Sequence, residues 1–360
     1  MNSDKTVVVA MSGGVDSSVA AALLVKQGYR VIGMMLRLWS EPGTEAANRC
    51  CTPDAMGLAR SIAGSLGIPF YPVDVRESFR DTVVEYFIDG YSRGLTPNPC
   101  LVCNREIRWG ILREHAVALG AHYLATGHYA ILETASDGTV SLLRAVDRKK
   151  DQSYILSVLS QDQLRCTLFP VGGYTKSEIR QLAKDFDLPS AARADSQDLC
   201  FVTSGDYRQF YQRNSTDASR AGPIRNVQGM QIGEHLGLEN YTIGQRKGLG
   251  INSAIPLYVV DKVQDQNALV VGEKAELGKL KLIAREANWI AALPGNTPFD
   301  AKVQIRYRAQ EAGALIYPAE STRFTVQFNE PVPDITPGQL AVVYRGETCL
   351  GSGVIEAGIP

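Results

Sequence analysis

The feature that most constrains this chain is a strand–turn–helix pattern close to its start. Val7 to Ala10 is a continuous, mostly β-branched apolar run, which predicts a short buried strand. Ser12-Gly13-Gly14 then predicts a tight turn, and Asp16-Ser17-Ser18 predicts the cap of a helix that continues through Ala20 to Leu24. Glycines let a backbone approach an anion, and a helix N-terminus attracts it. No Gly-Lys-Ser/Thr follows, so the pattern predicts a phosphate site that is not a Walker loop.

Length and composition bound the class of protein. With 360 residues, 45% hydrophobic and 21% charged, the chain is typical of a globular protein of two or three domains. We find neither a signal peptide nor an apolar run that could cross a bilayer, so we expect a cytoplasmic protein with no membrane partner. Seven cysteines, an odd number, argue against a disulfide scaffold. A net charge of −1 gives no support for a nucleic-acid partner, although it is compatible with a local basic surface.

The first half of the chain alternates apolar strand candidates with helical patterns. Strands predicted over Arg30–Leu36, Ile68–Asp74 and Tyr123–Gly127 join the opening strand, and helices between them indicate βαβ units and a mostly parallel sheet. Ligands bind such sheets at the carboxyl ends of the strands, so the opening turn, Leu36 and Gly127-His128 should lie along one rim.

From Gly222 onward the apolar runs become short and β-rich. Short strands at close spacing predict a small mixed domain followed by an antiparallel β-barrel. The fold class expected is therefore α/β with two appended β-rich domains. We place the domains at residues 1–205 (nucleotide binding), 206–280 (small, β-rich) and 281–360 (barrel).

Thiols occur in three informative places. Cys100 and Cys103 form a C-x-x-C pair in a proline-rich loop, which is compatible with a plain connector, a redox pair, or part of a metal or iron–sulfur site. Cys200 follows the polar stretch Asp195–Asp198; from the residues alone it is a lone thiol, more often buried than catalytic. Cys50-Cys51 lies in a predicted loop and is assigned no role.

Three further groups could be functional or structural. His128 is the one histidine predicted on the ligand rim. The sequence fits an active-site role and a structural role for it equally well. Asn240 to Gly250 is a glycine-punctuated loop with adjacent Arg246 and Lys247, which fits either a plain connection or a phosphate contact. Ile305-Arg-Tyr-Arg308 alternates charged and aromatic residues at the end of a strand predicted from Lys302, so Arg306 and Arg308 would share one face. A solvated strand face is an equally compatible interpretation.

Several uninterrupted motifs follow one another in an order typical of one family. The sequence closely resembles the tRNA-specific 2-thiouridylases, which use an ATP pyrophosphatase loop, and the resemblance runs from about Lys5 to Gly353. It is carried by Ser12-Gly-Gly-Val-Asp-Ser17, Thr96-Pro-Asn-Pro-Cys-x-x-Cys-Asn104, Ala125-Thr-Gly-His-Tyr129, Lys150-Asp-Gln-Ser-Tyr154, Asp195-Ser-Gln-Asp-Leu-Cys-Phe201 and Gly244-Gln-Arg-Lys-Gly-Leu-Gly250.

The resemblance implies an enzyme that makes 2-thiouridine at the wobble position of tRNA, using ATP and Mg²⁺. It implies Cys200 as the persulfide carrier and Cys103 as its partner nucleophile, which could form a disulfide with Cys200 or free hydrosulfide. The ATP contacts implied are Ala10, Met11, Ser12, Gly13, Gly14, Val15, Asp16, Ser17, Leu36 and Gly127. The tRNA contacts implied are Asn98, Pro99, Cys100, His128, Lys150, Asp151, Gln152, Arg306, Tyr307 and Gln339. The resemblance also implies that the domain at residues 206–280 binds tRNA. A cysteine desulfurase or sulfur-relay protein is the implied sulfur donor.

Alternatives remain open at this stage. Some family members have Asp where this chain has Cys100, so Cys100, Cys103 and Cys200 could instead hold an iron–sulfur cluster whose open iron carries the sulfur. An ATP-dependent amidating synthetase shares the same loop, but no glutaminase signature is visible. A non-catalytic RNA-binding protein would not need the intact loop.

Overall fold

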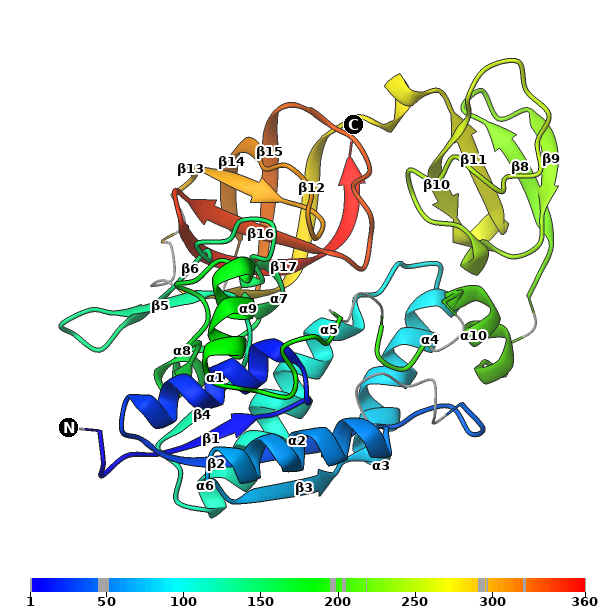
Figure 1. Cartoon of the computed structure of the whole chain (residues 1–360). Helices are drawn as coiled ribbons and strands as arrows, with labels where there is room; N and C mark the ends of the chain where they lie inside the picture. The colour runs from blue at the N-terminus through cyan, green and yellow to red at the C-terminus, as the bar shows by residue number, and fades with distance from the viewer. Residues whose placement is uncertain are drawn as a thin grey trace. The chain divides into compact units, whose positions relative to one another are not determined.

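The computed structural model describes residues 2–44, 52–194, 199–202, 205–217, 219–290, 295, 297–319 and 322–359. The chain forms two compact units. The first consists of Met1–Val83, Cys100–Gly205 and Gly346–Leu350, and the second of Val84–Pro99, Asp206–Arg345 and Gly351–Pro360. Figure 1 shows the elements of both. In the described part of the chain, no helix is long and apolar enough to cross a membrane.

A five-stranded parallel sheet forms the centre of the first unit. Its order is β3-β2-β1-β4-β7, and every neighbouring pair is parallel. The crossovers between these strands are helical, as the alternating sequence pattern predicts. The strands are β1 (Thr6–Ala10), β2 (Arg30–Arg37), β3 (Phe70–Asp74), β4 (Tyr123–Ala125) and β7 (Thr167–Leu168).

Three helices pack with this sheet in one apolar core. They are α1 (Val15–Lys26), α2 (Pro53–Ser65) and α9 (Lys176–Asp185). Helix α1 is buried from Ser17 to Leu24 on almost every side, because it lies between the sheet and α9 and has no wide solvent face. This burial fixes its N-terminus directly after β1, which positions the turn between them.

The remaining elements of the first unit extend this core. They are α3 (Arg76–Phe79), the π-helices η2 (Arg80–Val84) and η3 (Cys103–Leu112), α5 (Pro99–Val102), α6 (Arg113–Ala118), α7 (Ser153–Leu156), α8 (Gln161–Arg165) and the hairpin β5 (Ile131–Thr134) and β6 (Val140–Leu143). Strand β6 also pairs with the first residues of β17 (Thr348–Ile359).

The second unit contains a small mixed sheet of order β10-β11-β8-β9, in which β11 and β8 are parallel. Helices α4 (Glu85–Ser92) and α10 (Tyr207–Asn214) pack together through stacked and edge-on aromatic rings. The sheet and its connections comprise β8 (Gly222–Asn226), β9 (Gln231–His235), η4 (Leu238–Asn240), β10 (Tyr258–Val263), η5 (Gln264–Gln266), β11 (Ala268–Gly272) and η6 (Lys274–Leu277).

The same unit contains an antiparallel barrel of order β12-β15-β14-β13-β16-β17, closed by pairing of β12 with β17. Its other strands are β12 (Lys279–Trp289), β13 (Phe299–Gln304), β14 (Ala312–Ala319), β15 (Arg323–Val332) and β16 (Leu340–Arg345). The predicted fold class is thus confirmed. The strand predicted over residues 302–307 is wrong at its end: β13 stops at Gln304, and the positive φ of Arg308 belongs to the turn that follows.

Candidate nucleotide and sulfur-transfer site

The turn between β1 and α1 holds its shape through its own serines. The Ser12 backbone N–H donates to Ser17 Oγ at 3.2 Å, and the Gly14 N–H approaches Ser12 Oγ at 3.4 Å. Gly13 has a φ of +69°, and a Cβ there would lie 2.8 Å from the carbonyl oxygen of Ala55. The positive φ and the close approach of Ala55 explain why position 13 needs glycine.

The N-terminus of α1 differs from the sequence prediction. We expected Asp16-Ser17-Ser18 to cap the helix, but the N-cap is Gly14 and no side chain caps it. Ser18 Oγ instead donates to the Gly14 carbonyl at 2.7 Å, and the Asp16 carboxylate is bound elsewhere. The backbone N–H groups of the first turn therefore remain available to an anion, which the helix dipole also favours.

Gly127, just after β4, lies directly against this helix N-terminus. A Cβ at Gly127 would be 2.6 Å from Ser17 N and 2.7 Å from Asp16 C, so only glycine permits the approach. Leu36 is half-buried near the carboxyl end of β2 and pairs with Val73 of β3. The structure therefore brings the opening turn and Gly127 together at the predicted rim, with Leu36 on the neighbouring strand.

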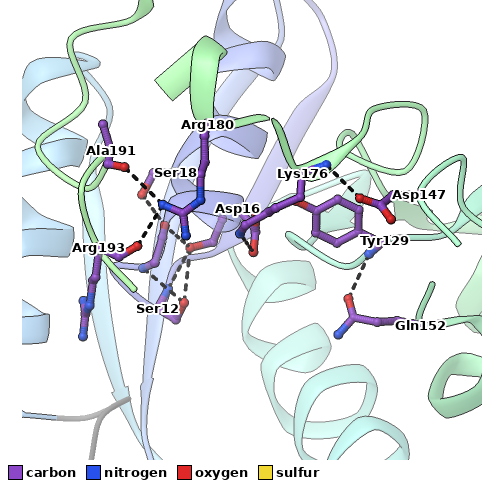
Figure 2. A network of polar contacts seen from close by, with 12 residues as sticks. Ser12, Asp16, Ser18, Tyr129, Asp147, Gln152, Lys176, Arg180, Ala191 and Arg193 are labelled. Carbon is purple, nitrogen blue, oxygen red and sulfur yellow. Dashed lines mark hydrogen bonds and ion pairs between the residues drawn. The ribbon is translucent and has the colours of Figure 1, made fainter. Parts of the chain in front are cut away.

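Asp16 is the acidic residue of the turn, and two side chains neutralise and orient it (Figure 2). Lys176 Nζ lies 2.7 and 2.9 Å from its two carboxylate oxygens, and the Tyr129 hydroxyl donates to it at 2.7 Å. The Lys176 backbone N–H donates to Asp147 at 3.0 Å, and Gln152 Oε1 accepts from the Tyr129 N–H at 2.9 Å. Lys176 is the first residue of α9, directly after the capping-box residue Thr175, and nothing in the sequence indicates that its side chain reaches the turn.

Arg193 is a second residue that the sequence did not single out. Its guanidinium donates to the Gly13 carbonyl at 3.0 Å, while Arg180 donates to the carbonyls of Ala191 and Arg193 at 3.4 and 3.2 Å. Figure 2 shows both arginines beside the turn. The Arg193 side chain therefore connects the segment that precedes Cys200 to the nucleotide turn, and Arg180 of α9 holds the backbone of this segment.

The candidate thiols all belong to the first unit. Cys100 is half-buried on α5, and Cys103 begins η3 with 7% exposure. Cys200 is half-buried, and the adjacent Phe201 packs edge-on against Phe79. Within the described ranges, no three His, Cys, Asp or Glu side chains form a group able to hold a metal ion. Residues 50–51 and 195–198 lie outside the described part.

His128 is buried and its ring is held on both sides. Arg108 Nη1 lies 3.1 Å from His128 Nε2 and 2.9 Å from Asn104 Oδ1, and Thr126 Oγ1 lies 2.7 Å from His128 Nδ1. A guanidinium only donates, so Nε2 accepts and the proton of the neutral ring is assigned to Nδ1. Burial, and secondarily the charge of Arg108, hold the pKa of His128 well below 6.5.

The stretch Lys150-Asp151-Gln152 is largely engaged with the protein itself. Asp151 is 9% exposed; Arg144 lies 3.2 Å from its Oδ2, and its oxygens also accept from the Ala145 N–H and Ser153 Oγ. Gln152 binds the backbone of Tyr129, and Lys150 is half-buried.

The other residues expected at tRNA lie in the second unit. Gln339 Nε2 donates to the Thr96 carbonyl at 2.8 Å, two residues before the half-buried Asn98. Arg306 forms an ion pair with Asp334 at 2.9 Å. Pro99 is buried, whereas Tyr307 is half-buried beneath the Arg308 guanidinium.

Together, the Ser-Gly-Gly-Val-Asp-Ser turn, the uncapped helix N-terminus and the parallel sheet define a nucleotide-binding domain of the ATP pyrophosphatase class. Three family models match the chain: the tRNA methyl transferase HUP domain over residues 5–204, the tRNA methyl transferase PRC-barrel domain over 209–273 and the aminomethyltransferase beta-barrel domain over 279–355.

Curated relatives narrow the class to one family. A tRNA-specific 2-thiouridylase MnmA of Carboxydothermus hydrogenoformans is 45% identical over 98% of both chains. MnmA proteins of Moorella thermoacetica and Symbiobacterium thermophilum are each 46% identical, over 97% and 99% of this chain and 99% and 93% of theirs. The chain belongs to the tRNA-specific 2-thiouridylase MnmA family, a family of tRNA sulfurtransferases, which confirms the resemblance seen in its motifs.

Proposed function

We propose that the protein 2-thiolates the wobble uridine of tRNA, by ATP-dependent adenylation of the C2 oxygen followed by sulfur transfer from a cysteine persulfide. The observation that carries this proposal is the uncapped N-terminus of α1, against which Gly127 packs with no room for a side chain. That arrangement suits a polyphosphate, and the candidate thiols belong to the same compact unit.

The first chemical step activates a poor leaving group. The uridine C2 oxygen attacks the α-phosphorus of ATP and pyrophosphate departs, so the oxygen becomes part of an adenylate. The backbone N–H groups of the first turn of α1 and the α1 dipole stabilise the departing negative charge. Mg²⁺, when bound with ATP, would supply further charge neutralisation at the phosphates. Both Asp16 oxygens already contact Lys176 Nζ, so we assign the ion no ligand in the turn.

The second step exchanges oxygen for sulfur. The terminal sulfur of a Cys200 persulfide attacks C2, and AMP leaves with the former C2 oxygen. The Cys103 thiolate then attacks Cys200 Sγ, which breaks the S–S bond, leaves the sulfur on C2 and forms a Cys103–Cys200 disulfide. If Cys103 attacks before transfer, the same disulfide forms and free hydrosulfide becomes the nucleophile. A thiol reductant must reopen the disulfide, and a persulfide-donor protein must recharge Cys200.

An iron–sulfur cluster on Cys100, Cys103 and Cys200 is the other way to hold the sulfur. The three thiols do not form one group of potential ligands in the described part of the chain, so we derive no step through a cluster. Anaerobic purification with an iron assay tests this directly. Iron bound in proportion to activity, and lost in a Cys100→Ser variant, would favour the cluster over the persulfide.

We further propose that the domains divide at 205 and 280, that the enzyme works in the cytoplasm, and that the tRNA positions drawn from the family resemblance contact RNA. Because the target base is stacked in a folded tRNA, it must turn outward to reach both ATP and thiols.

The decisive test uses Cys103→Ser and Cys200→Ser with ATP, tRNA and a persulfide donor. Both variants should lose 2-thiouridine formation, measured by nucleoside mass spectrometry, and should keep ATP binding. Cys166→Ser, which alters a half-buried thiol on another part of the unit, is the matched control. Full thiolation by either Cys103→Ser or Cys200→Ser would refute the proposal.

A further inference from the structure

A rigid loop of the second unit presents two adjacent cations that the proposed reaction does not use. It runs from Tyr241 to Gly250, between η4 and β10, in the small mixed sheet domain (Figure 1). Ile243 and Leu249 are 8% and 6% exposed and belong to the core of this domain. Between these two anchors, Arg246, Lys247 and Gly248 are all exposed.

Hydrogen bonds hold the loop in one shape. The Gly244 N–H donates to the Val259 carbonyl at 2.8 Å, and the Val259 N–H donates to the Gln245 carbonyl at 2.9 Å. The Gln245 side chain accepts from the Thr242 N–H at 3.1 Å and donates to the Lys247 carbonyl at 2.9 Å. The cations therefore project from a fixed backbone, which lowers the entropy lost when they bind a partner.

The two cations of this loop have no ion-pair partner among the described residues. In the described part of the chain, neither Arg246 nor Lys247 has a carboxylate within ion-pair distance, whereas Arg285 and Arg323 pair with Glu286 and Glu356. In a protein whose net charge is −1, two adjacent unpaired cations on a rigid loop form a local anion-binding surface.

One side of the loop adjoins Arg306. Gly244 has a φ of +84°, and a Cβ there would lie 2.1 Å from Asp334 Oδ1, so the loop backbone packs closely on Asp334. The same carboxylate binds the half-buried Arg306 guanidinium at 2.9 Å through Oδ2. Arg306, which we propose to contact tRNA, therefore shares a contact residue with the loop.

The other side adjoins the segment that leads to Asn98. Thr242 and Thr96 approach through their hydroxyl groups at 3.4 Å, and Gln339 donates to the Thr96 carbonyl at 2.8 Å. The loop thus contacts, within one compact unit, the supports of three positions proposed to meet the RNA: Asn98, Arg306 and Gln339.

We infer that Arg246 and Lys247 bind phosphates of the tRNA sugar–phosphate backbone and extend the RNA surface onto the small mixed sheet domain. This inference rests on the proposed function. Successive phosphates along an RNA strand suit two neighbouring cations. Contacts to phosphates carry no sequence information, so we expect the loop to position the RNA without reading its sequence. An acidic surface of the sulfur donor is the competing partner, and the experiment separates the two.

The experiment measures tRNA binding by fluorescence anisotropy at several KCl concentrations. Arg246→Gln/Lys247→Gln is compared with Lys274→Gln/Lys281→Gln, which removes two exposed lysines of the same unit that form no ion pair in the described part. Each lost phosphate contact lowers the magnitude of the log–log salt slope by about 0.7–0.9. The loop variant should therefore lose about 1.5 in slope and bind about 30-fold more weakly near 0.1 M salt, while the control matches wild type.

Arg246→Lys/Lys247→Arg keeps both charges and should bind nearly as wild type, and thermal melting establishes that all variants are folded. Equal affinity and slope in the loop variant and the control would overturn the inference while leaving the proposed function intact. If the loop variant binds tRNA normally but binds a persulfide-donor protein more weakly, the loop contacts that protein, and the inference is overturned in this case too. Failure of the wild-type enzyme to bind tRNA would overturn the proposed function as well.

Discussion

Removal of the Lys176 charge should weaken ATP binding because Asp16 would then carry an uncompensated negative charge beside the phosphates. Lys176 contacts both carboxylate oxygens, and the two side chains are 13% and 32% exposed. A carboxylate about 6 Å from a phosphate charge, roughly one helical turn, costs about 3 kcal/mol at an effective dielectric constant near 20. Solvent around Asp16 reduces this to about half. Lys176→Met should therefore bind ATP about tenfold more weakly.

Isothermal titration with ATP in EDTA, without tRNA, isolates this effect from any role of Asp16 toward Mg²⁺. Lys184→Met, which removes an exposed lysine from the last turn of the same helix, should bind as wild type. Asp16→Asn/Lys176→Met removes both charges and should recover to within about threefold of wild type. If Lys176→Met binds normally while folded, or if the double variant is as weak as the single one, charge compensation is not the role of Lys176.

Three further predictions concern the surrounding residues. Gly127→Ala should destabilise the protein by about 1–3 kcal/mol and abolish ATP binding, because the new Cβ meets the α1 backbone, whereas Gly173→Ala has open space and should do neither, as thermal melts and titrations would show. His128 is neutral in the folded protein, so below pH 6.5 only the unfolded state binds a proton at this side chain. The free energy of unfolding should therefore fall by about 1.4 kcal/mol per pH unit until the pH reaches the pKa of the folded state. His128→Gln should remove that slope in denaturant titrations, whereas a slope unchanged from wild type would contradict the assignment. Asp151→Ala should cost about 3–5 kcal/mol because it leaves Arg144 buried without its ion-pair partner, and a normal melting temperature would show that the pair is not structural.

The architecture was largely predictable because its signals are local. The apolar run before Ser12, the glycine turn and the apolar helix each act within a few residues, and alternation of such units implies a parallel sheet. The wrong prediction at residues 302–307 has the same origin, since alternating residues continue past Gln304 although the backbone turns there. Turn geometry depends on packing that alternation does not encode.

The site was predictable only in part, because its polar partners come from distant segments. Lys176 is 160 residues from Asp16 and Arg193 is 180 residues from Gly13, so no spacing rule connects them. The wrong prediction of a helix cap at Asp16 arose because only neighbouring residues were considered. An acidic residue after a glycine turn often caps a helix, but here a distant lysine binds it. The chain topology brings α9 beside α1, and this decides that Asp16 binds Lys176 and does not cap the helix.

Three of the residues expected at tRNA are bound within the protein, which limits where the positive charge for RNA binding can come from. His128 is held neutral, Asp151 is neutralised by Arg144, and Gln152 binds the Tyr129 backbone, so these three positions supply no positive charge to a phosphate. If they meet tRNA, they do so through shape and backbone, as suits a pocket for an uncharged base. The salt-dependent part of tRNA affinity must then arise from cations elsewhere, and Arg246 and Lys247 are exposed and without a carboxylate partner in the described part. A salt slope that survives replacement of both would mean that other cations carry the RNA.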